Sequence, residues 1–332
     1  MISDIENKGV SVETSKTQHK IPIKAPSTVK VMLTGAAGAV GVSIVKQLAG
    51  KVDLYAYTHK QLDITQLAAV CEIIDKVKPD IIINAAGYTA VDNAQNDETQ
   101  ANLVNHDGAQ YLALAAEKIN AVLFHLSTDY VFSGESDAAY TEQDLPHPIN
   151  VYGHSKLAGE LAIQQSCTKH IIIRTAWVFA EHGQNFVRTI LTLAKNHSQL
   201  DIVDDQIGGP TYTGDIAKVI EVLINKLSGD DVSSVHYGIY HYCGLPYVSW
   251  KGFADAIIMA AKQGDIIDTL PKVNGILSEA YPRAAKRPKN SRLDCRKIAQ
   301  VFDVLPSDWQ AALSVLVSST DFSLEPLMKP KP

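Results

Sequence analysis

The order of hydrophobic and polar positions becomes regular at Val29. From there, short apolar runs typical of buried strands alternate with stretches whose apolar residues recur at helical spacing. Strands that alternate with helices predict a parallel sheet with helices on both faces, the Rossmann-type doubly wound α/β fold. After a first strand at Val29 and a first helix that ends near Gly50, the pattern predicts strands at 52–57, 80–86, 121–128 and 170–178 and helices at 65–77, 99–118 and 151–165.

The regular alternation weakens after Trp177. Beyond it the chain becomes richer in aromatic residues and glycine, which is typical of irregular connections between short elements. The elements still predicted there are a helix at 184–196, a strand at 200–203, a turn at "GGPT" and a helix at 214–227.

The composition is that of an ordinary globular protein. Its 332 residues are 46% hydrophobic and 20% charged, which is enough for a substantial core. A formal net charge of −6 argues against nucleic acid or an anionic membrane as the main partner. The four cysteines and eleven histidines lack disulfide-framework or metal-site spacing, so we expect reduced thiols and no metal. No apolar run reaches the ~20 residues that span a bilayer and no signal peptide is visible, so we expect a cytoplasmic protein.

A glycine-rich turn follows the first strand. "TGAAGAVG" places Gly35, Gly38 and Gly41 at three-residue spacing, directly before a helix. Glycines there let the backbone approach a pyrophosphate, and the helix N-terminus supplies unpaired N–H donors. We predict a dinucleotide site, against the alternative of tight packing between helix and sheet.

These observations divide the chain into regions. We predict a flexible N-terminal extension at 1–28, a dinucleotide-binding domain at 29–176 and a smaller, partly interleaved C-terminal domain at 177–332 that is mainly substrate-binding. Residues at about 205–230 are expected to return to the first domain.

A second motif lies in "VYGHSKLAGE". Tyr152 and Lys156 are one helical turn apart, so their side chains share a face and can act on one ligand. The alternative is an ordinary surface pair. Free tyrosine has a pKa near 10, and a neighbouring ammonium favours the phenolate that remains after proton donation.

The glycine spacing together with Y-x-x-x-K resembles the extended branch of the short-chain dehydrogenase/reductase superfamily. Members carry Ser or Thr at the end of the fourth strand, where this chain has Thr128. The resemblance implies that Thr128, Tyr152 and Lys156 are catalytic, with Asn105 supporting the site. It also implies cofactor contacts at Gly35, Gly38, Ala39, Val40, Gly41, His59, Asp63, Ile64, Ala86, Gly87, Thr89, Tyr152 and Lys156.

The roles implied for these three residues are those of a ketone reduction. Tyr152 would protonate the carbonyl oxygen, and Thr128 would hydrogen-bond to the same oxygen. Lys156 would tune Tyr152 and hold the nicotinamide ribose. We expect NADPH as the cofactor with NADH tolerated, because the second strand ends in "YAYTHK", where His59 and Lys60 can accommodate a 2'-phosphate. The alternative is that both are solvated loop side chains.

The stretch "STDYVFSG" distinguishes reduction from elimination. Sugar-nucleotide dehydratases of this superfamily carry an Asp-Glu pair after the threonine, because eliminating water needs an additional acid and base. Tyr130 stands here where that glutamate would be. Plain reduction is therefore favoured.

From Val29 to about Asp308 the sequence resembles the dTDP-4-dehydrorhamnose reductase family. The motifs, in order, are "TGAAGAVG", "YTAVD", "STDYVFSG", "NVYGHSKLAGE", "RTAWVF", "NFV", "DQIGGPT" and "RPKNSRLD". The resemblance implies reduction of the C4 ketone of dTDP-4-dehydro-6-deoxy-L-mannose to dTDP-L-rhamnose, a precursor for polysaccharide biosynthesis. It also implies that Thr128, Asp129 and Trp177 contact the sugar, Trp177 by apolar packing. The alternative for Trp177 is an ordinary core position.

The segment 283–297 is strongly basic. It has seven basic residues and one acid, and Arg side chains bind phosphate in fork geometry. We predict a contact from Arg287 to the dTDP-sugar substrate, against the alternative of a solvated basic face.

Two further expectations concern partners. Some members of the family are dimers bridged by magnesium, but no acid occurs between Gly35 and Val52, so we expect a monomer or weak homodimer without a metal bridge. A binding module of the same fold, the regulatory subunit of methionine adenosyltransferase, is the alternative to an enzyme. Trp177 and the intact "DQIGGPT" favour the reductase.

Overall fold

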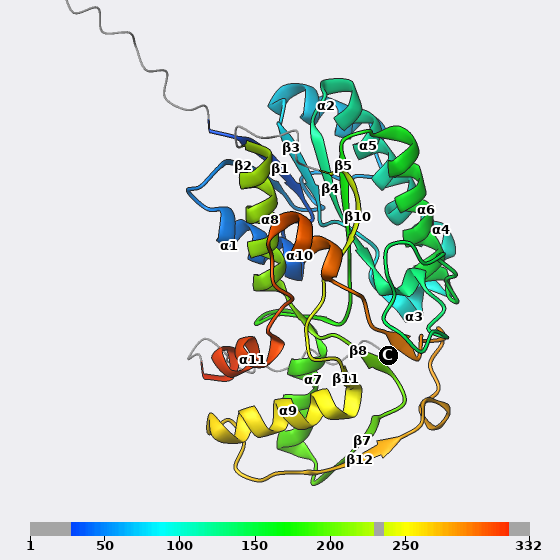
Figure 1. Cartoon of the computed structure of the whole chain (residues 1–332), viewed down its shortest axis with the longest axis vertical. Coiled ribbons are helices and arrows are strands. Elements are labelled where there is room, and N and C mark those ends of the chain that lie inside the picture. The colour runs from blue at the N-terminus through cyan, green and yellow to red at the C-terminus, as the bar shows by residue number, and fades with distance from the viewer. Residues whose placement is uncertain (1–27, 229–235, 319–332) are drawn as a thin grey trace, which may run out of the picture.

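The computed structural model describes residues 28–228 and 236–318. Figure 1 shows a large sheet flanked by helices and, below it, a smaller group of helices and short strands. Apart from Thr28, the predicted N-terminal extension lies outside the described residues.

A six-stranded parallel sheet forms the centre of the larger part. Its order is β10-β5-β4-β3-β1-β2, which confirms the predicted doubly wound α/β fold. Because helices cover both faces, central strands such as Ile81–Asn84 are continuous apolar runs and not alternating ones. The strands are β1 (Lys30–Thr34), β2 (Asp53–Tyr57), β3 (Ile81–Asn84), β4 (Val122–Thr128), β5 (His170–Thr175) and β10 (Gly238–His241).

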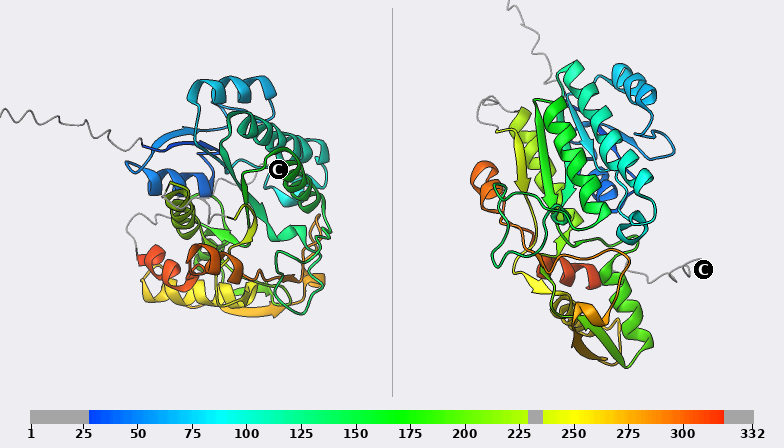
Figure 2. Two further views of the ribbon diagram at one scale, coloured as in Figure 1. Left: turned by 45° about the horizontal axis from the view of Figure 1, so that its top comes forward. Right: turned by 90° about the vertical axis from the view of Figure 1, so that its right-hand side faces the viewer.

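Two groups of helices cover the two faces, as the side view in Figure 2 also shows. One face packs against α1 (Ala39–Leu48) and α8 (Thr213–Ser228). The other packs against α2 (Leu67–Val77), α5 (Gly108–Ile119) and α6 (Val151–Ser166). Both groups bury Ile, Val and Leu side chains on the sheet, so the sheet carries two hydrophobic cores.

Late segments of the chain return to this first layer. α8 packs along α1, where the Ser43 hydroxyl donates to Thr213 Oγ1 at 2.8 Å. β10 adds a parallel edge strand beside β5, beyond the 205–230 range in which the sequence predicts a return. α10 (Arg296–Phe302) packs against β10 and α8.

The helix predicted at 99–118 has a local distortion. It consists of α4 (Glu98–Asn102), a π-helical turn at Leu103–Asp107 and α5. The turn widens the helix where α6 approaches closely, since a Cβ on Gly159 would lie 2.1 Å from the Asn105 backbone oxygen. π-turns inside helices are frequent at functional sites, and this one carries Asn105.

The prediction of a strand at 170–178 is wrong at the C-terminal end, because it extends the strand too far. β5 stops at Thr175, and Trp177 adopts a left-handed conformation with φ +47. That conformation turns the chain out of the sheet, because a strand requires extended backbone. The following strand β6 (Val178–Phe179) pairs instead with β9 (Thr211–Tyr212).

The smaller part has its own core. α7 (Phe186–Asn196), α9 (Trp250–Gln263) and α11 (Trp309–Ser318) bury Phe253 and Trp309. The short strands pair as β7 (Gln199–Val203) with β12 (Lys272–Ile276), and as β8 (Ile207–Gly208) between β11 (Val248–Ser249) and β13 (Asn290–Ser291). The predicted helix 184–196 and strand 200–203 are thereby confirmed. A short α3 (Val91–Ala94) lies beside α6.

Candidate active site

The glycine loop joins β1 to α1 at the carboxyl edge of the sheet. Gly35 has φ +71, and a Cβ there would lie 2.5 Å from the backbone of Ala85 and Ala86. A Cβ on Gly41 would lie 2.1 Å from the Gly35 oxygen. Close packing, the alternative considered from the sequence, is therefore a real requirement at these two positions.

The third glycine lies differently. Gly38 is exposed and caps α1, which begins at Ala39 and Val40 with no acid in its first turn. The N-terminal N–H groups of a helix attract an anion, and no carboxylate of that turn repels one. The tight loop and a helix start without a side-chain cap both fit a dinucleotide pyrophosphate.

The predicted cofactor contacts His59, Asp63 and Ile64 lie beyond β2. Asp63 Oδ1 accepts hydrogen bonds from the backbone N–H and the hydroxyl of Thr65, so the carboxylate stabilises its own turn. The side chain of Ile64 is buried in the core against Gly108 and faces away from solvent. His59 is exposed, with Nδ1 3.9 Å from Asp63 Oδ1. Of these three, His59 is free to turn toward a ligand.

The loop after β3 passes between the glycine loop and the catalytic helix. A Cβ on Gly87 would lie 4.0 Å from Lys156 Nζ. Ala86 is half-buried and Thr89 is exposed on the same loop. The structure thus brings Gly87 of this loop beside the predicted catalytic lysine.

Asn105 fastens this loop to α6. Its Oδ1 accepts from the Tyr88 backbone N–H at 2.8 Å, and its Nδ2 donates to Ser155 Oγ at 2.9 Å. The amide is buried, so both bonds are shielded from water. Asn105 therefore supports the site by fixing two of its elements relative to each other.

β4 and α6 bring the three predicted catalytic residues together. Thr128 ends β4, and Tyr152 on α6 lies close enough for the Thr128 hydroxyl to act on the pKa of its phenol. Lys156, one turn further, donates from Nζ to the Leu126 oxygen at 2.7 Å. All three side chains are buried at the carboxyl end of the sheet, where ligands bind in open α/β folds.

The pKa values of this group depart from the sequence expectation in one respect. Burial raises the pKa of Tyr152 to about 12 and lowers that of Lys156 to about 8. The ammonium is directed at Leu126 O, and desolvation outweighs the hydrogen bond from Thr128, so the phenol is not acidified. Tyr152 is a protonated donor at neutral pH.

Asp129 is a buried carboxyl group next to Thr128. Thr128 Oγ1 donates to Asp129 Oδ1 at 3.1 Å, and the nearby Ser291 hydroxyl lowers the pKa of the carboxyl group. Burial raises its pKa to about 6, and its Oδ2 has no hydrogen-bond partner within the described residues. A buried, partly unpaired carboxyl is poised to bind a polar group such as a sugar hydroxyl.

Behind the catalytic residues lies a buried ion pair. Arg174 on β5 binds Glu160 on α6 through two nitrogens, the shorter contact being 2.6 Å, and Ser127 donates to the same carboxylate at 2.5 Å. These three groups lock β4, β5 and α6 together. The sequence gives no sign of this group, because nothing in the spacing of the three residues reveals that three elements meet there.

Trp177 stacks on Trp250, with ring centroids 3.6 Å apart and planes at 9°. A Cβ on Gly208 would lie 2.5 Å from the Trp177 ring, so glycine makes room for the indole. Trp177 is half-buried and keeps part of its surface open. Sequence analysis missed Trp250 and Ser291, although the aromatic-rich composition after Trp177 is a weak signal for the first.

Arg287 is anchored near the catalytic helix. Its Nη2 lies 2.9 Å from Asp92 Oδ2, and its guanidinium lies 5.8 Å from the centroid of the Tyr130 ring. Tyr130 in turn packs edge-on against Tyr152, at 5.5 Å between centroids. The structure therefore brings Arg287 close to the site, but with a carboxylate already bound.

The other basic residues of 283–297 do not form one patch. Lys289 pairs with Asp205 and Arg296 with Asp294, at 3.5 and 2.5 Å. Lys297 lies over the Tyr240 ring. The positive charge seen in the sequence is thus partly balanced, by Asp92 and Asp205 from elsewhere in the chain and by Asp294 within the segment.

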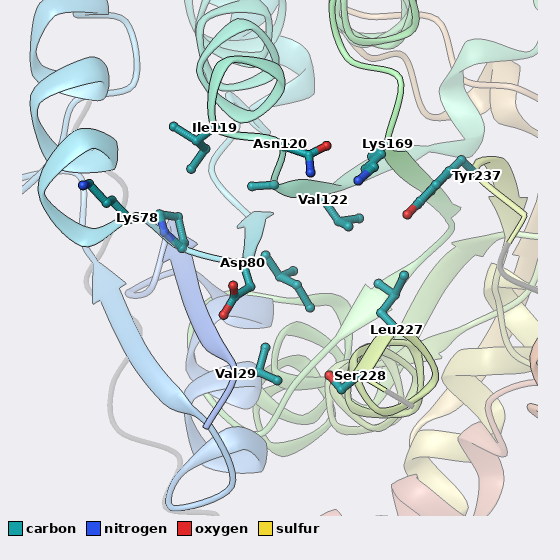
Figure 3. Close-up of a pocket in the computed structure, with 13 residues that line it drawn as sticks. Val29, Lys78, Asp80, Ile119, Asn120, Val122, Lys169, Leu227, Ser228 and Tyr237 are labelled. Atoms are coloured by element: carbon teal, nitrogen blue, oxygen red, sulfur yellow. The ribbon is translucent and has the colours of Figure 1, made fainter. Parts of the chain in front are cut away.

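One cavity lies far from this chemistry. It has a volume of about 610 Å³ and opens at the amino ends of β3 and β4, between Lys78, Asp80, Lys169 and Tyr237 (Figure 3). The predicted site residues follow the carboxyl ends of the same strands. The cavity is therefore at the opposite edge of the sheet and takes no part in the site.

Within 28–228 and 236–318, no group of His, Cys, Asp and Glu side chains is arranged to hold a metal ion. Over the same ranges, no helix combines the length and apolar character needed to cross a membrane.

The chain is similar to known proteins over nearly all of its described length. The family model described as RmlD substrate binding domain matches residues 29–321. A dTDP-4-dehydrorhamnose reductase from Aggregatibacter actinomycetemcomitans is 48% identical over 286 residues, covering 86% of this chain and 97% of the relative.

Two solved structures share both fold and sequence. A dTDP-4-dehydrorhamnose reductase from Clostridium acetobutylicum has a TM-score of 0.80 at 36% identity, covering 87% of this chain and 98% of its own. The enzyme from Bacillus anthracis, solved in complex with NADP, has a TM-score of 0.79 at 34% identity with the same coverage. These identities, the sheet order and the grouping of Thr128, Tyr152 and Lys156 agree, and the chain belongs to the dTDP-4-dehydrorhamnose reductase family.

Proposed function

We propose that this chain uses NADPH to reduce the C4 ketone of dTDP-4-dehydro-6-deoxy-L-mannose, which gives dTDP-L-rhamnose. The observation that carries the proposal is the grouping of Thr128, Tyr152 and Lys156 at the carboxyl edge of the sheet, where the loop after β3 lies between Lys156 and the glycine loop. Family membership supports the same reaction. The relatives are named as reductases, so the regulatory-subunit alternative has no support.

The bound nicotinamide would supply the hydride. Gly35, Gly38 and Gly41, with the helix start at Ala39 and Val40, would hold its pyrophosphate. Lys156 would hold the nicotinamide ribose, and Gly87 passes beside it. His59 would reach a 2'-phosphate, because its side chain is exposed and can turn toward a ligand. The relative solved with NADP supports this preference.

The chain's own side chains would then manage the proton and the sugar. Tyr152 donates its hydroxyl proton to the ketone oxygen, and Thr128 donates a hydrogen bond to the same oxygen. Asp129 would bind a sugar hydroxyl, and Trp177 would pack on the sugar ring. Arg287 would reach the diphosphate by exchanging Asp92 for it.

We further propose that the nucleotide domain is 29–176 with α8 and β10 added, and that the rest of 177–332 mainly binds substrate. The contacts of α8 with α1 and the pairing of β10 with β5 support this division. A cytoplasmic location and a monomeric or weakly dimeric state complete the proposal.

The direct test is an assay with the keto sugar generated in place by the upstream dehydration and epimerisation reactions. NADPH oxidation should match the loss of 4-keto sugar, and NADH should support a lower rate. dTDP-glucose, the matched control, should not be dehydrated, because Tyr130 replaces the glutamate needed for elimination. Tight NADPH binding without any oxidation would refute the proposed reaction.

A further inference from the structure

A row of buried polar side chains crosses the centre of the sheet. Thr34, Asn84 and His125 occupy facing positions in β1, β3 and β4. Each is 1% exposed, in a sheet whose neighbouring positions are almost all Ile, Leu, Val and Phe. Buried polar groups are costly unless bonded, so a row of three at one register calls for a reason.

The hydrogen bonds of Asn84 fix the direction of its amide. Its Oδ1 accepts from Thr34 Oγ1 at 2.8 Å and from the Ala86 backbone N–H at 3.1 Å. A backbone N–H can only donate, so the amide oxygen and not the NH₂ group must face Ala86. Asn84 Nδ2 then faces His125 Nδ1, at 3.0 Å.

This orientation selects one form of the His125 ring. An amide NH₂ only donates, so His125 Nδ1 must accept, and the neutral ring carries its proton on Nε2. Burial and then the charge of Lys156 hold the pKa of His125 well below its usual range, which excludes the imidazolium. The Nε2–H group lies 3.2 Å from Lys156 Nζ.

The contact between Nε2–H and Lys156 depends on the charge of the lysine. An ammonium has three donors and no lone pair, whereas the neutral amine has a lone pair that can accept from Nε2–H. Leu126 O accepts from either form, at 2.7 Å. Glu160, on the same helix, favours the ammonium, but its own charge is balanced by Arg174. Among these neighbours, His125 is thus the one whose hydrogen bond with Lys156 depends on whether the lysine is charged or neutral.

We propose that His125, held as the Nε2–H tautomer by Asn84, is a positioning residue that disfavours the charged form of Lys156 and so sets the pH at which the site loses its lysine charge. The proposal rests on the proposed function, in which Lys156 holds the nicotinamide ribose. It adds a series of buried polar contacts that runs from Thr34 through Asn84 and His125 to Lys156. The series begins at the residue before the glycine loop.

The first test determines the tautomer of His125 in the wild-type protein. It does not require the protein to be active. Protein labelled with ¹⁵N-histidine is examined by long-range proton–nitrogen correlation between pH 6 and 9, and His125 is assigned by comparison with His125→Gln. We expect a protonated Nε2 and an unprotonated Nδ1. A proton on Nδ1 would overturn the inference while leaving the reductase assignment intact.

The second test reverses the direction of the hydrogen bond between residue 84 and His125. Asn84→Asp keeps the shape and the acceptor for Thr34 and Ala86 but replaces the NH₂ donor by an acceptor. The ring should switch to Nδ1–H, so that Nε2 accepts from the ammonium and Lys156 stays charged to higher pH. We expect both the alkaline limb of kcat/KM and the amine reactivity of Lys156 to move up by about one pH unit or more.

A matched background separates this effect from the bare charge of the new carboxylate. His125→Phe keeps a ring of similar size but has no nitrogen to carry the switch. Asn84→Asp introduced into His125→Phe should move the Lys156 titration far less than in the wild type. An equal shift in both backgrounds, or none in either, would refute the role of His125. If a variant fails to fold, the tautomer of His125 measured in the wild-type protein still tests the proposal.

Discussion

Trp177 and Trp250 lie face to face across the boundary between the sheet and the smaller part of the molecule. Their centroids are 3.6 Å apart, and Trp177 reaches this position through its left-handed backbone conformation. Phe186 packs at a tilt against Trp250, with 4.5 Å between the ring centroids. The indole of Trp177 is therefore a supported apolar wall and not a loose surface ring.

Trp177→Ala should raise KM for the keto sugar about tenfold, which corresponds to the loss of one aromatic contact. NADPH affinity should stay unchanged, because the indole is not part of the glycine loop. Trp250→Ala, the matched variant, should act in the same direction but less, since it removes the support and leaves the wall. Steady-state kinetics with both substrates will check this, and an unchanged KM in Trp177→Ala would exclude the sugar contact.

Tyr152→Phe should lower kcat by at least about 100-fold, the usual contribution of a positioned proton donor. Its ring remains packed against Tyr130, so folding and NADPH affinity should persist. Fluorescence titration of NADPH and single-turnover kinetics separate the two effects. Retention of most of the wild-type turnover would remove Tyr152 from the mechanism.

Gly35→Ala should abolish NADPH binding and destabilise the fold by more than about 3 kcal/mol, because its Cβ would collide with the loop backbone after β3. Gly50→Ala is the matched control, with φ +73 but open space around it. That variant should cost about 1 kcal/mol from backbone strain alone and bind NADPH normally. Denaturant unfolding and NADPH titration compare the pair, and equal losses would refute the steric argument.

Asp129 should make stability depend on pH. Its folded pKa, about 6, lies above the unfolded value of 3.8, so the folded state holds the proton more tightly and loses stability as pH rises from about 4 to 6. At pH 8, Asp129→Asn should therefore be more stable than wild type by up to about 3 kcal/mol. The difference should shrink at pH 5. Urea unfolding at both pH values measures it, and a less stable Asp129→Asn at pH 8 would contradict the expectation.

Magnesium should not hold two subunits together. The first helix has no acid between Gly35 and Val52 that could act as a ligand. Sedimentation with and without a chelator should therefore give the same mass. A chelator-dependent change in mass would show that ligands come from another part of the chain.

Local sequence determined most strands of the sheet and the local placement of several candidate site residues. β-branched runs such as Ile81–Ile83 form strands, and the spacing of Tyr152 and Lys156 places both on one face of α6, because these patterns depend only on neighbouring residues. The glycine loop could also be predicted from local sequence, namely from the spacing of its glycines after the first strand. In parallel strands all carboxyl ends meet at one edge, so Thr128 could also be placed beside Tyr152 in advance.

Tertiary structure decided what depends on distant partners. The direction of Trp177, the return of β10 to the sheet and the pairing of Arg287 with Asp92 follow from packing between segments far apart in the chain. The pKa of Tyr152 was expected to fall, yet burial raises it, because desolvation is set by everything that surrounds the ring. The row from Thr34 to His125 exists only through strand register, which no single segment of sequence contains.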